Sequence, residues 1–330
     1  MGRHSKIIAS GSYAPERVIK NEWFNEQLGE DVDTWLRENL TIRERRWMEE
    51  DQSTSDLCVE AGEAALEMAE LRKEDIDLLI IATDTPDFIS PSTASVVQQK
   101  MGLVNATSLD TNTACAGFPT AMTLANSMMV ADSVYKKVMV IGAYGMSRFL
   151  DLNDKKTVTL FADGAGAVIL EPTEDKAEGF LASDLRTKPE YYKHMGIYGG
   201  GAAAPAARSE SKGGVQCLQF VEKFPKEINP RVWTDMIRTI AEKGEFSTDD
   251  ISGAYMTQIN INQIWETMDN LSLNRQTAPT IMDEYGYTGS AAIPMVFDKA
   301  LRNGSVSKGD ILVFVGSGGG LHFGACAYRW

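Results

Sequence analysis

The feature that most constrains the fold of this 330-residue chain is a pattern that occurs twice, at an offset of 175 residues. Each copy consists of a helical stretch, a polar turn and a short apolar run that is typical of a buried parallel strand. The first copy ends in Ile76 to Thr83. The second has its helix over Trp233 to Gly244 and its strand over Ile251 to Gln258. Duplication of one α/β half would leave such a repeat, so we expect two similar halves.

Three further apolar segments, each bounded by glycine or charged residues, predict buried strands at Lys137 to Ala143, Gly164 to Leu170 and Asp310 to Gly316. Alternation of such strands with helical stretches indicates an α/β architecture with parallel sheets. The region from Arg186 to Pro230 breaks this pattern, because glycine and alanine runs replace the apolar periodicity. We interpret it as a long irregular insertion, which forms either a lid or pocket wall or a surface loop.

Composition and charge exclude several classes of function. The net charge of −14 opposes general binding to nucleic acid. No apolar run approaches the ~18 residues of a membrane span and no signal segment begins the chain, so we expect a cytoplasmic protein. Four cysteines and three histidines are too few, and wrongly spaced, for a disulfide framework or a histidine-based metal site. We therefore expect reduced thiols and no metal.

Cys115 is the strongest candidate for a nucleophile. The stretch from Asp110 to Phe118 is typical of a strand that leads through a tight turn into a helix, which we predict over Pro119 to Ala131. A thiol at this junction lies near the positive end of the helix, which favours the thiolate. The alternative is a buried cysteine that only fills space in a tight turn.

Several motifs, in matching order and spacing over nearly the whole chain, are shared with one known family. They are Ile8 to Pro15, Ile42 to Arg45, Ala114 to Phe118, Val138 to Gly142, Phe161 to Leu170 and Gly316 to Gly324. Together they resemble the β-ketoacyl-ACP synthase III family of the thiolase superfamily. Thr41 departs from the pattern, because the family usually has glycine there.

The resemblance implies an α/β, thiolase-like five-layered α-β-α-β-α fold of two duplicated halves. Residues 1–172 would form the half that carries the nucleophile, and residues 173–330 the second half, with the insertion at about 186–230. It also implies an acyltransferase that forms an acyl thioester on Cys115 from acyl-CoA or an acyl carrier protein and passes the acyl group to a second substrate. The family is usually homodimeric and needs no cofactor beyond the CoA or phosphopantetheine thioester itself.

The same resemblance assigns roles to further residues. The backbone N–H groups of Cys115 and Gly319 would form an oxyanion hole. Trp35 matches the aromatic residue that stacks on the adenine of CoA, and Lys155 matches a basic residue for its phosphates. The alternatives are an ordinary glycine turn at Gly319 and plain surface residues at Trp35 and Lys155.

Two catalytic positions depart from the family pattern. Gln258 stands where we place the histidine of the H-Q-A-N motif, and Tyr287 replaces the asparagine of the G-N-T-S motif. Both side chains donate neutral hydrogen bonds, but neither becomes a cation near pH 7, so decarboxylative condensation is weakened. His322, in the closing glycine turn, is the candidate base for the thiol, and His194 in the insertion is a weaker one.

Two other functions stay open at this point. The chain is either an active acyltransferase or a non-catalytic subunit that supports an active ketosynthase partner, with Cys115 as a relic. A thioesterase that hydrolyses its own acyl-enzyme is the third alternative.

Overall fold

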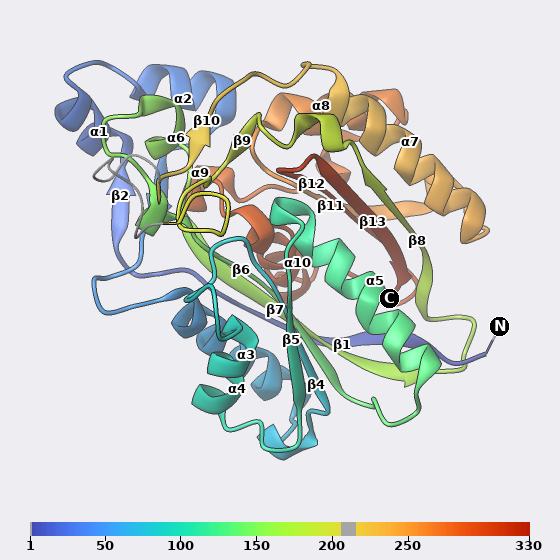
Figure 1. Ribbon diagram of the computed structural model, residues 1–330. Helices are drawn as coiled ribbons and strands as arrows, with labels where there is room; N and C mark the ends of the chain where they lie inside the picture. Colours follow the sequence, from blue (N-terminus) through green and yellow to red (C-terminus); the bar gives the residue numbers. More distant parts are fainter. Residues whose placement is uncertain (1, 206–215) are drawn as a thin grey trace.

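The computed structural model describes residues 2–205 and 216–330 and arranges the main strands in two sheets (Figure 1). The first sheet has the order β1-β7-β6-β4-β5, with β1 (His4–Tyr13), β7 (Asp163–Thr173), β6 (Val138–Gly145), β4 (Leu78–Ala82) and β5 (Thr107–Thr111). The second has the order β11-β12-β13-β8, with β11 (Ile251–Met256), β12 (Ile311–Gly318), β13 (His322–Arg329) and β8 (Gly179–Thr187).

The two sheets have the same connectivity. In the first sheet β4 runs parallel to β6, β6 antiparallel to β7, and β7 antiparallel to β1. In the second, β11 runs parallel to β12, β12 antiparallel to β13, and β13 antiparallel to β8. Only β5, which pairs with β4 at one edge, lacks a counterpart in the four-stranded sheet. The prediction of two duplicated halves is confirmed.

The offset of 175 residues also relates the turns and helices of the two halves. It carries the short turn Ala114–Ala116 onto the turn Gly289–Ala291, each of which leads into a helix of the central layer. Ala114 and Gly289 share a left-handed backbone, with φ of 48° and 49°. Cys115 of the first half therefore corresponds to Ser290 of the second, whose Oγ donates to the carbonyl of Ala143 at 2.6 Å.

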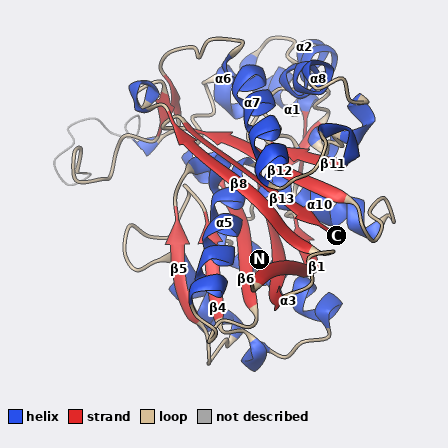
Figure 2. Cartoon of the chain, turned by 90° about the vertical axis from the view of Figure 1, so that its right-hand side faces the viewer, coloured by secondary structure: helices blue, strands red, loops and turns tan. Residues whose placement is uncertain are grey.

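The helices complete five layers (Figure 1, Figure 2). The helices α5 (Gly117–Ala131) and α10 (Ala292–Arg302) lie between the two sheets and contact strands of both. One outer face is covered by α3 (Thr54–Ala69) and α4 (Thr93–Met101), and the other by α7 (Ile228–Lys243) and α8 (Ile261–Asn270). Three clusters of buried apolar side chains fill the spaces between these layers.

The sequence pattern of the strands follows from this burial. All five residues of β4 and all eight of β6 and of β12 are buried. A strand covered by helices on both faces needs an unbroken apolar run, and such runs were the basis for predicting these three strands. The predicted segment Gly164 to Leu170 lies inside the longer β7.

Short elements gather at one end of the molecule, above the ends of both sheets (Figure 1). They are α1 (Asn21–Leu28), α2 (Asp33–Leu40), β2 (Val18–Lys20), β3 (Glu44–Arg46), α6 (Lys155–Val158), α9 (Met282–Tyr285), β9 (Met195–Gly196) and β10 (Gln219–Phe220). The predicted insertion at about 186–230 contributes the antiparallel pair β9 and β10, so it is not wholly irregular, although residues 206–215 lie outside the described chain. Within residues 2–205 and 216–330, no helix combines the length and apolar character that crossing a bilayer requires.

Candidate active site

Cys115 lies at a pocket of about 400 Å³. The pocket walls come from both halves of the chain, and their apolar members are Trp35, Leu40, Leu160, Met195, Phe220, Phe224, Ile259 and Leu321. The thiol residue itself is only 2% exposed. The pocket thus connects a buried sulfur to the surface through a largely apolar passage, which suits an acyl chain.

The turn that carries Cys115 packs tightly against the end of β12. A Cβ at Gly318 would lie 2.5 Å from the backbone N of Cys115 and from the carbonyl of Thr113, so only glycine fits there. A Cβ at Gly319 would meet nothing closer than the carbonyl of Met195 at 3.3 Å. Gly318 is therefore the residue that lets β12 approach the turn, and Gly319 borders the pocket beside it.

Two phenols surround the sulfur. The hydroxyls of Tyr287 and Tyr144 both hydrogen-bond to the thiol of Cys115, and each tyrosine is 1% exposed. Backbone hydrogen bonds hold Tyr287 in place, since its N–H donates to Leu160 and its carbonyl accepts from Ala162, both at 2.9 Å. Burial raises the pKa of both phenols well above their ordinary value, so they remain protonated donors.

The balance of effects on the thiol opposes ionisation. Burial raises the pKa of Cys115, the nearby charge of Asp84 raises that pKa further, and the hydrogen bonds from Tyr287 and Tyr144 offset only part of this rise. The sequence analysis expected the positive end of the helix to lower the pKa of Cys115, but burial raises this pKa by more. The resting nucleophile is a neutral thiol, and its reaction needs a group that takes the proton.

Asp84, which the sequence analysis missed, acts electrostatically on Cys115 although it is not among the residues that line the pocket. It follows the carboxyl end of β4, and burial raises the pKa of its carboxyl to about 6. The position carried a usable signal, because polar residues just beyond the carboxyl ends of parallel strands commonly face a ligand crevice. The sequence analysis identified the strand from its apolar run but did not consider the aspartate that follows it.

Gln258 does not line the pocket, which corrects the predicted placement. Its Oε1 accepts from the N–H of Ile281 at 2.9 Å, and its Nε2 donates to the carbonyl of Pro279 at 3.4 Å. The preceding residue, Thr257, is not among the lining residues either. Its Oγ1 accepts from the N–H of Ser317 at 3.1 Å.

The H-Q-A-N motif also matches the sequence one residue earlier than predicted, over Thr257 to Asn260. Thr257 occupies the histidine position, Gln258 matches the motif glutamine, and Asn260, which lines the pocket, matches its asparagine. Threonine, like glutamine, has no cationic form. In either register no histidine stands at the motif position, and the loss of its catalytic role stays a prediction.

Neither histidine proposed as a base lines the pocket. His322 begins β13, where its Nδ1 lies 3.2 Å from the hydroxyl of Thr187 and partial burial lowers the pKa of its ring. His194 stacks on Phe224, with ring centroids 5.2 Å apart, and its Nε2 lies 3.8 Å from Glu222. His194 therefore lies behind Phe224, which is one of the pocket walls.

The mouth of the pocket has a different set of basic residues from the predicted one. Trp35 lies at the pocket and is 55% exposed, as a stacking surface requires. Lys155 is not among the lining residues, and its Nζ pairs with Glu30 at 2.9 Å. Lys223 and Lys226, at the end of the predicted insertion, line the mouth instead. Their segment lacks periodicity, so the sequence offered no way to place them.

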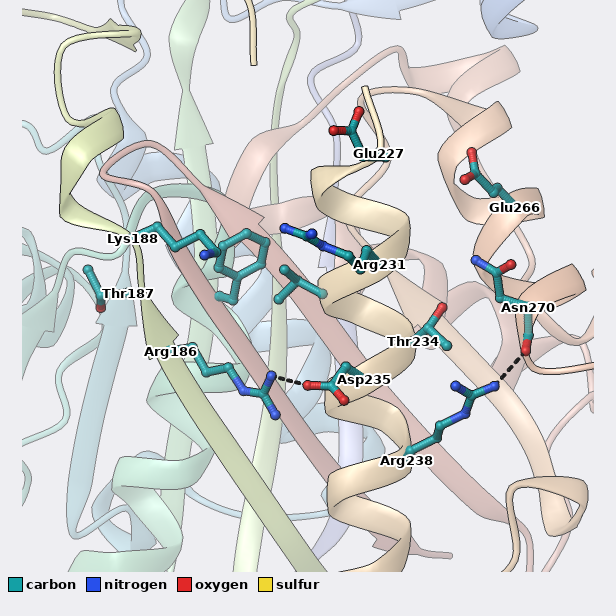
Figure 3. Close-up of a pocket in the computed structure, with 12 residues that line it drawn as sticks. Arg186, Thr187, Lys188, Glu227, Arg231, Thr234, Asp235, Arg238, Glu266 and Asn270 are labelled. Carbon is teal, nitrogen blue, oxygen red and sulfur yellow. Dashed lines mark hydrogen bonds and ion pairs between the residues drawn. The ribbon is translucent and has the colours of Figure 1, made fainter. Parts of the chain in front are cut away.

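A second, larger pocket of about 690 Å³ lies over α7 and β8 (Figure 3). Arg186 forms an ion pair with Asp235 across it, and Arg238 donates to the carbonyl of Asn270 at 2.9 Å. It shares no lining residue with the thiol pocket and contains no cysteine. In the part of the chain that the structure describes, no group of His, Cys, Asp or Glu is placed to hold a metal ion. The thiol pocket is therefore the candidate active site.

Comparisons with known proteins agree with this geometry. The family model for 3-oxoacyl-[acyl-carrier-protein] synthase III matches residues 109–189, and the model for its C-terminal part matches residues 241–330. The β-ketoacyl-[acyl-carrier-protein] synthase III of Clostridioides difficile is 35% identical over 330 residues, covering 100% of this chain and 99% of that protein. That of Staphylococcus aureus (strain Newman) is 33% identical, with 98% of each covered.

Solved structures of the same kind are equally similar. The crystal structure of 3-oxoacyl-[acyl-carrier-protein] synthase III from Aquifex aeolicus has a TM-score of 0.88 at 28% identity and covers 99% of this chain and 100% of that one. The β-ketoacyl-[acyl-carrier-protein] synthase III of Thermus thermophilus has a TM-score of 0.88 at 30% identity, with coverage of 98% and 99%.

Proposed function

Because the chain belongs to the β-ketoacyl-ACP synthase III family, we propose that it is an acyltransferase that carries its acyl group as a thioester on Cys115. The acyl donor is an acyl-CoA or an acyl carrier protein, and the acceptor is a second substrate. The observation that carries the proposal is a buried thiol at an apolar pocket whose mouth bears Trp35, Lys223 and Lys226. An aromatic ring and two cations suit the adenine and phosphates of CoA, or the phosphate of a carrier's phosphopantetheine.

The first half-reaction exchanges one thioester for another. The sulfur of Cys115 bonds to the carbonyl carbon of the donor, the bond from that carbon to the donor sulfur breaks, and the thiol proton ends on the departing thiol. We assign the oxyanion hole to the N–H groups of Cys115 and Gly319. Removing one such donor typically costs ~3 kcal/mol of transition-state stabilisation.

We infer that the second half-reaction is not an ordinary decarboxylative condensation. A decarboxylative condensation develops negative charge on a thioester enolate, which cationic or amide donors stabilise. Here Thr257 and Tyr287 occupy the two positions, and the Tyr287 hydroxyl already hydrogen-bonds to the sulfur. We infer that condensation is weakened and that transfer to a preformed nucleophile is favoured.

The decisive experiment is intact-protein mass spectrometry after incubation with a panel of acyl-CoA and acyl-carrier donors. The wild type is expected to gain the mass of one acyl group, and Cys115→Ala to gain none. Cys217→Ala is the matched control, because Cys217 is more exposed than Cys115 and lies outside the pocket lining, so it reports non-specific acylation.

The rival functions predict different outcomes in the same experiment. A non-catalytic subunit gains no mass from any donor, which would refute the proposal. A thioesterase releases free acid when no acceptor is present, whereas an acyltransferase holds the acyl group until the acceptor arrives. The homodimer expected for this family is checked separately by light scattering of the purified protein.

A further inference from the structure

The motif from Ile42 to Arg45 has no role in the chemistry described so far, although it contains an unusual side chain. Arg45 is 0% exposed. The partners of its guanidinium are neutral oxygens, since Nη1 donates to the carbonyl of Ile19 at 3.1 Å and to Oδ1 of Asn21 at 2.8 Å, and Nη2 donates to the carbonyl of Thr159 at 2.5 Å. A buried charge with only neutral partners costs folding free energy, so its presence calls for a functional reason.

The guanidinium of Arg45 joins two parts of the chain that are far apart in the sequence. Ile19 and Asn21 belong to β2 and the start of α1, whereas Thr159 directly follows α6. The ring of Phe24 in α1 lies against the guanidinium, with its centroid 4.5 Å from the central carbon. This contact and the three hydrogen bonds fix the orientation of the planar group, which in turn fixes the Thr159 carbonyl.

The Thr159 carbonyl belongs to a short segment, residues 159–162, which we call the anchor segment. Arg45 binds the carbonyl of Thr159, and Nε1 of Trp47 donates to the carbonyl of Phe161 at 3.1 Å. Arg45 lies in β3, and Trp47 directly follows this strand. The same part of the chain therefore holds the anchor segment at two points.

Tyr287 is bound to the anchor segment through its backbone. Its N–H donates to the carbonyl of Leu160, and its carbonyl accepts from the N–H of Ala162, both at 2.9 Å. Peptide groups are planar and the chain turns about only two bonds per residue, so displacement of the Thr159 carbonyl also displaces the Leu160 carbonyl next to it. The position of Tyr287 therefore depends on the contact that Arg45 makes.

A glycine shows how closely these parts pack. Gly286 directly precedes Tyr287 and has a φ of 61°. A Cβ at this position would lie 2.8 Å from the Cβ of Arg45 and 3.1 Å from the carbonyl oxygen of Leu160. Only glycine allows this turn to lie against both β3 and the anchor segment. Arg45 thus packs against the turn that carries Tyr287, although it does not line the thiol pocket.

We propose that Arg45 is a positioning residue for the acyl transfer and that it acts through Tyr287. By holding the Thr159 carbonyl, Arg45 fixes the anchor segment to which the Tyr287 backbone is bound. The Tyr287 hydroxyl hydrogen-bonds to the thiol of Cys115, where it stabilises negative charge on the sulfur while the thioester forms. The inference rests on the acyltransferase function proposed above.

Orientation matters for this hydroxyl, because a hydrogen bond weakens steeply when its length or angle departs from the ideal. The anchor segment positions the side chain as well as the backbone, since the ring centroids of Phe161 and Tyr287 lie 5.4 Å apart. Loss of the Arg45 guanidinium should therefore weaken stabilisation of the sulfur and leave donor binding at the mouth of the pocket unchanged.

The test is a double-mutant cycle on the maximal single-turnover rate of acyl-Cys115 formation, using an acyl-CoA that loads the wild type. Arg45→Met keeps an unbranched side chain without the guanidinium and should lower this rate by about 10-fold. The donor concentration that gives half the maximal rate should stay within about 2-fold of the wild-type value. In the Tyr287→Phe background, Arg45→Met should change the rate by less than about 2-fold, because the hydroxyl that Arg45 positions is gone.

Arg46→Met is the matched control. Successive side chains of β3 point to opposite faces, and Arg46 lies over the ring of Tyr285 at 5.8 Å and pairs with Glu44 at 3.2 Å. This variant removes a guanidinium from the adjacent position and leaves the hydrogen bonds of the anchor segment in place, so it should keep the wild-type rate.

An Arg45→Met rate equal to the wild-type rate, or an equal slowing in both backgrounds, overturns the positioning role and leaves the acyltransferase function intact. A wild-type rate in Tyr287→Phe overturns it as well. If Arg45→Met does not fold, as judged by circular dichroism, Arg45→Lys decides, because one ammonium lacks the planar fork that binds several oxygens at once. A wild-type rate in that folded variant overturns the assignment. If no donor loads the wild type at all, the proposed function fails and this inference fails with it.

Discussion

Cys115, Tyr287 and Asp84 come from three separate turns, and the sequence identifies them to very different degrees. Cys115 sits in a run of small residues between a strand and a helix, which identifies it without any homologue. Tyr287 is visible only as a departure from a family motif. Asp84 has no motif, because the effect of its charge on Cys115 depends on the fold and not on its neighbours in the chain.

Burial of Asp84 should also appear in the dependence of stability on pH. Its folded pKa of about 6 lies above the ordinary 3.8, so the folded state binds more protons than the unfolded state between these two values. The free energy of unfolding therefore falls as pH rises through this window. Asp84→Asn should raise that free energy by about 3 kcal/mol at pH 7 and leave it unchanged below about pH 4. Urea unfolding at both pH values measures the difference.

Asp163→Asn is the matched control for this effect. Burial also raises the pKa of Asp163 to about 6, but its carboxylate accepts from two backbone N–H groups that an amide cannot satisfy equally. We expect Asp163→Asn to destabilise the protein at pH 7. A destabilised Asp84→Asn would contradict the prediction and indicate a hydrogen-bond partner for that carboxyl.

The end of β11 shows that a single sequence does not determine which of two adjacent polar residues matches a motif. Thr257 and Gln258 are adjacent polar residues at the end of a strand, and either matches a motif whose histidine is absent. Which of them faces the pocket depends on strand alternation, and β11 ends at Met256, where alternation is no longer fixed by pairing. The hydrogen bonds of Gln258 to residues 279–281 hold its side chain away from the pocket lining.

At the scale of elements, the strands that were predicted are those buried on both faces. The apolar runs at β4, β6, β7, β11 and β12 stand out because helices cover both sides of them. In contrast, β8 is only partly buried and has no regular burial pattern, and the two-residue strands β9 and β10 are too short for any period. The pocket walls contributed by residues 188–227 therefore could not be derived from the pattern.

The contact between β12 and the thiol turn gives a prediction at this scale. A methyl group at Gly318 would lie 2.5 Å from two backbone atoms of the turn, so Gly318→Ala must displace either β12 or Cys115. We expect the rate of acyl-Cys115 formation to fall by at least about 100-fold, because misplacement of a reacting group by about 1 Å has that effect. Mass spectrometry of the loaded enzyme provides the rate.

Gly319→Ala is the neighbouring control, since its added methyl meets only the Met195 carbonyl at 3.3 Å and its backbone N–H is retained. We expect a much smaller decrease in the rate of acyl-Cys115 formation for Gly319→Ala. Equal losses in the two variants would show that the tight approach of Gly318 is not what holds the turn.

For the whole molecule, the central layer joins the two halves. Both α5 and α10 pack against strands of both sheets, and the largest buried cluster contains side chains from the two halves. Unfolding of one half would expose apolar surface of the other, so the halves should unfold together. Calorimetry is expected to show a single transition with a calorimetric enthalpy equal to the van't Hoff enthalpy. Two resolved transitions would contradict this picture.

The paired turns at Cys115 and Ser290 have a consequence for the history of the molecule. Two identical subunits around a two-fold axis would bring two copies of this turn face to face, each with its own hydroxyl or thiol. In this single polypeptide the two corresponding turns carry different residues, Cys115 and Ser290. One now presents the sulfur, while in the other Ser290 is tied to the Ala143 carbonyl and the neighbouring Tyr287 hydrogen-bonds to that sulfur. The two corresponding turns therefore differ in role, because one carries the sulfur and the other is held by a hydrogen bond of Ser290.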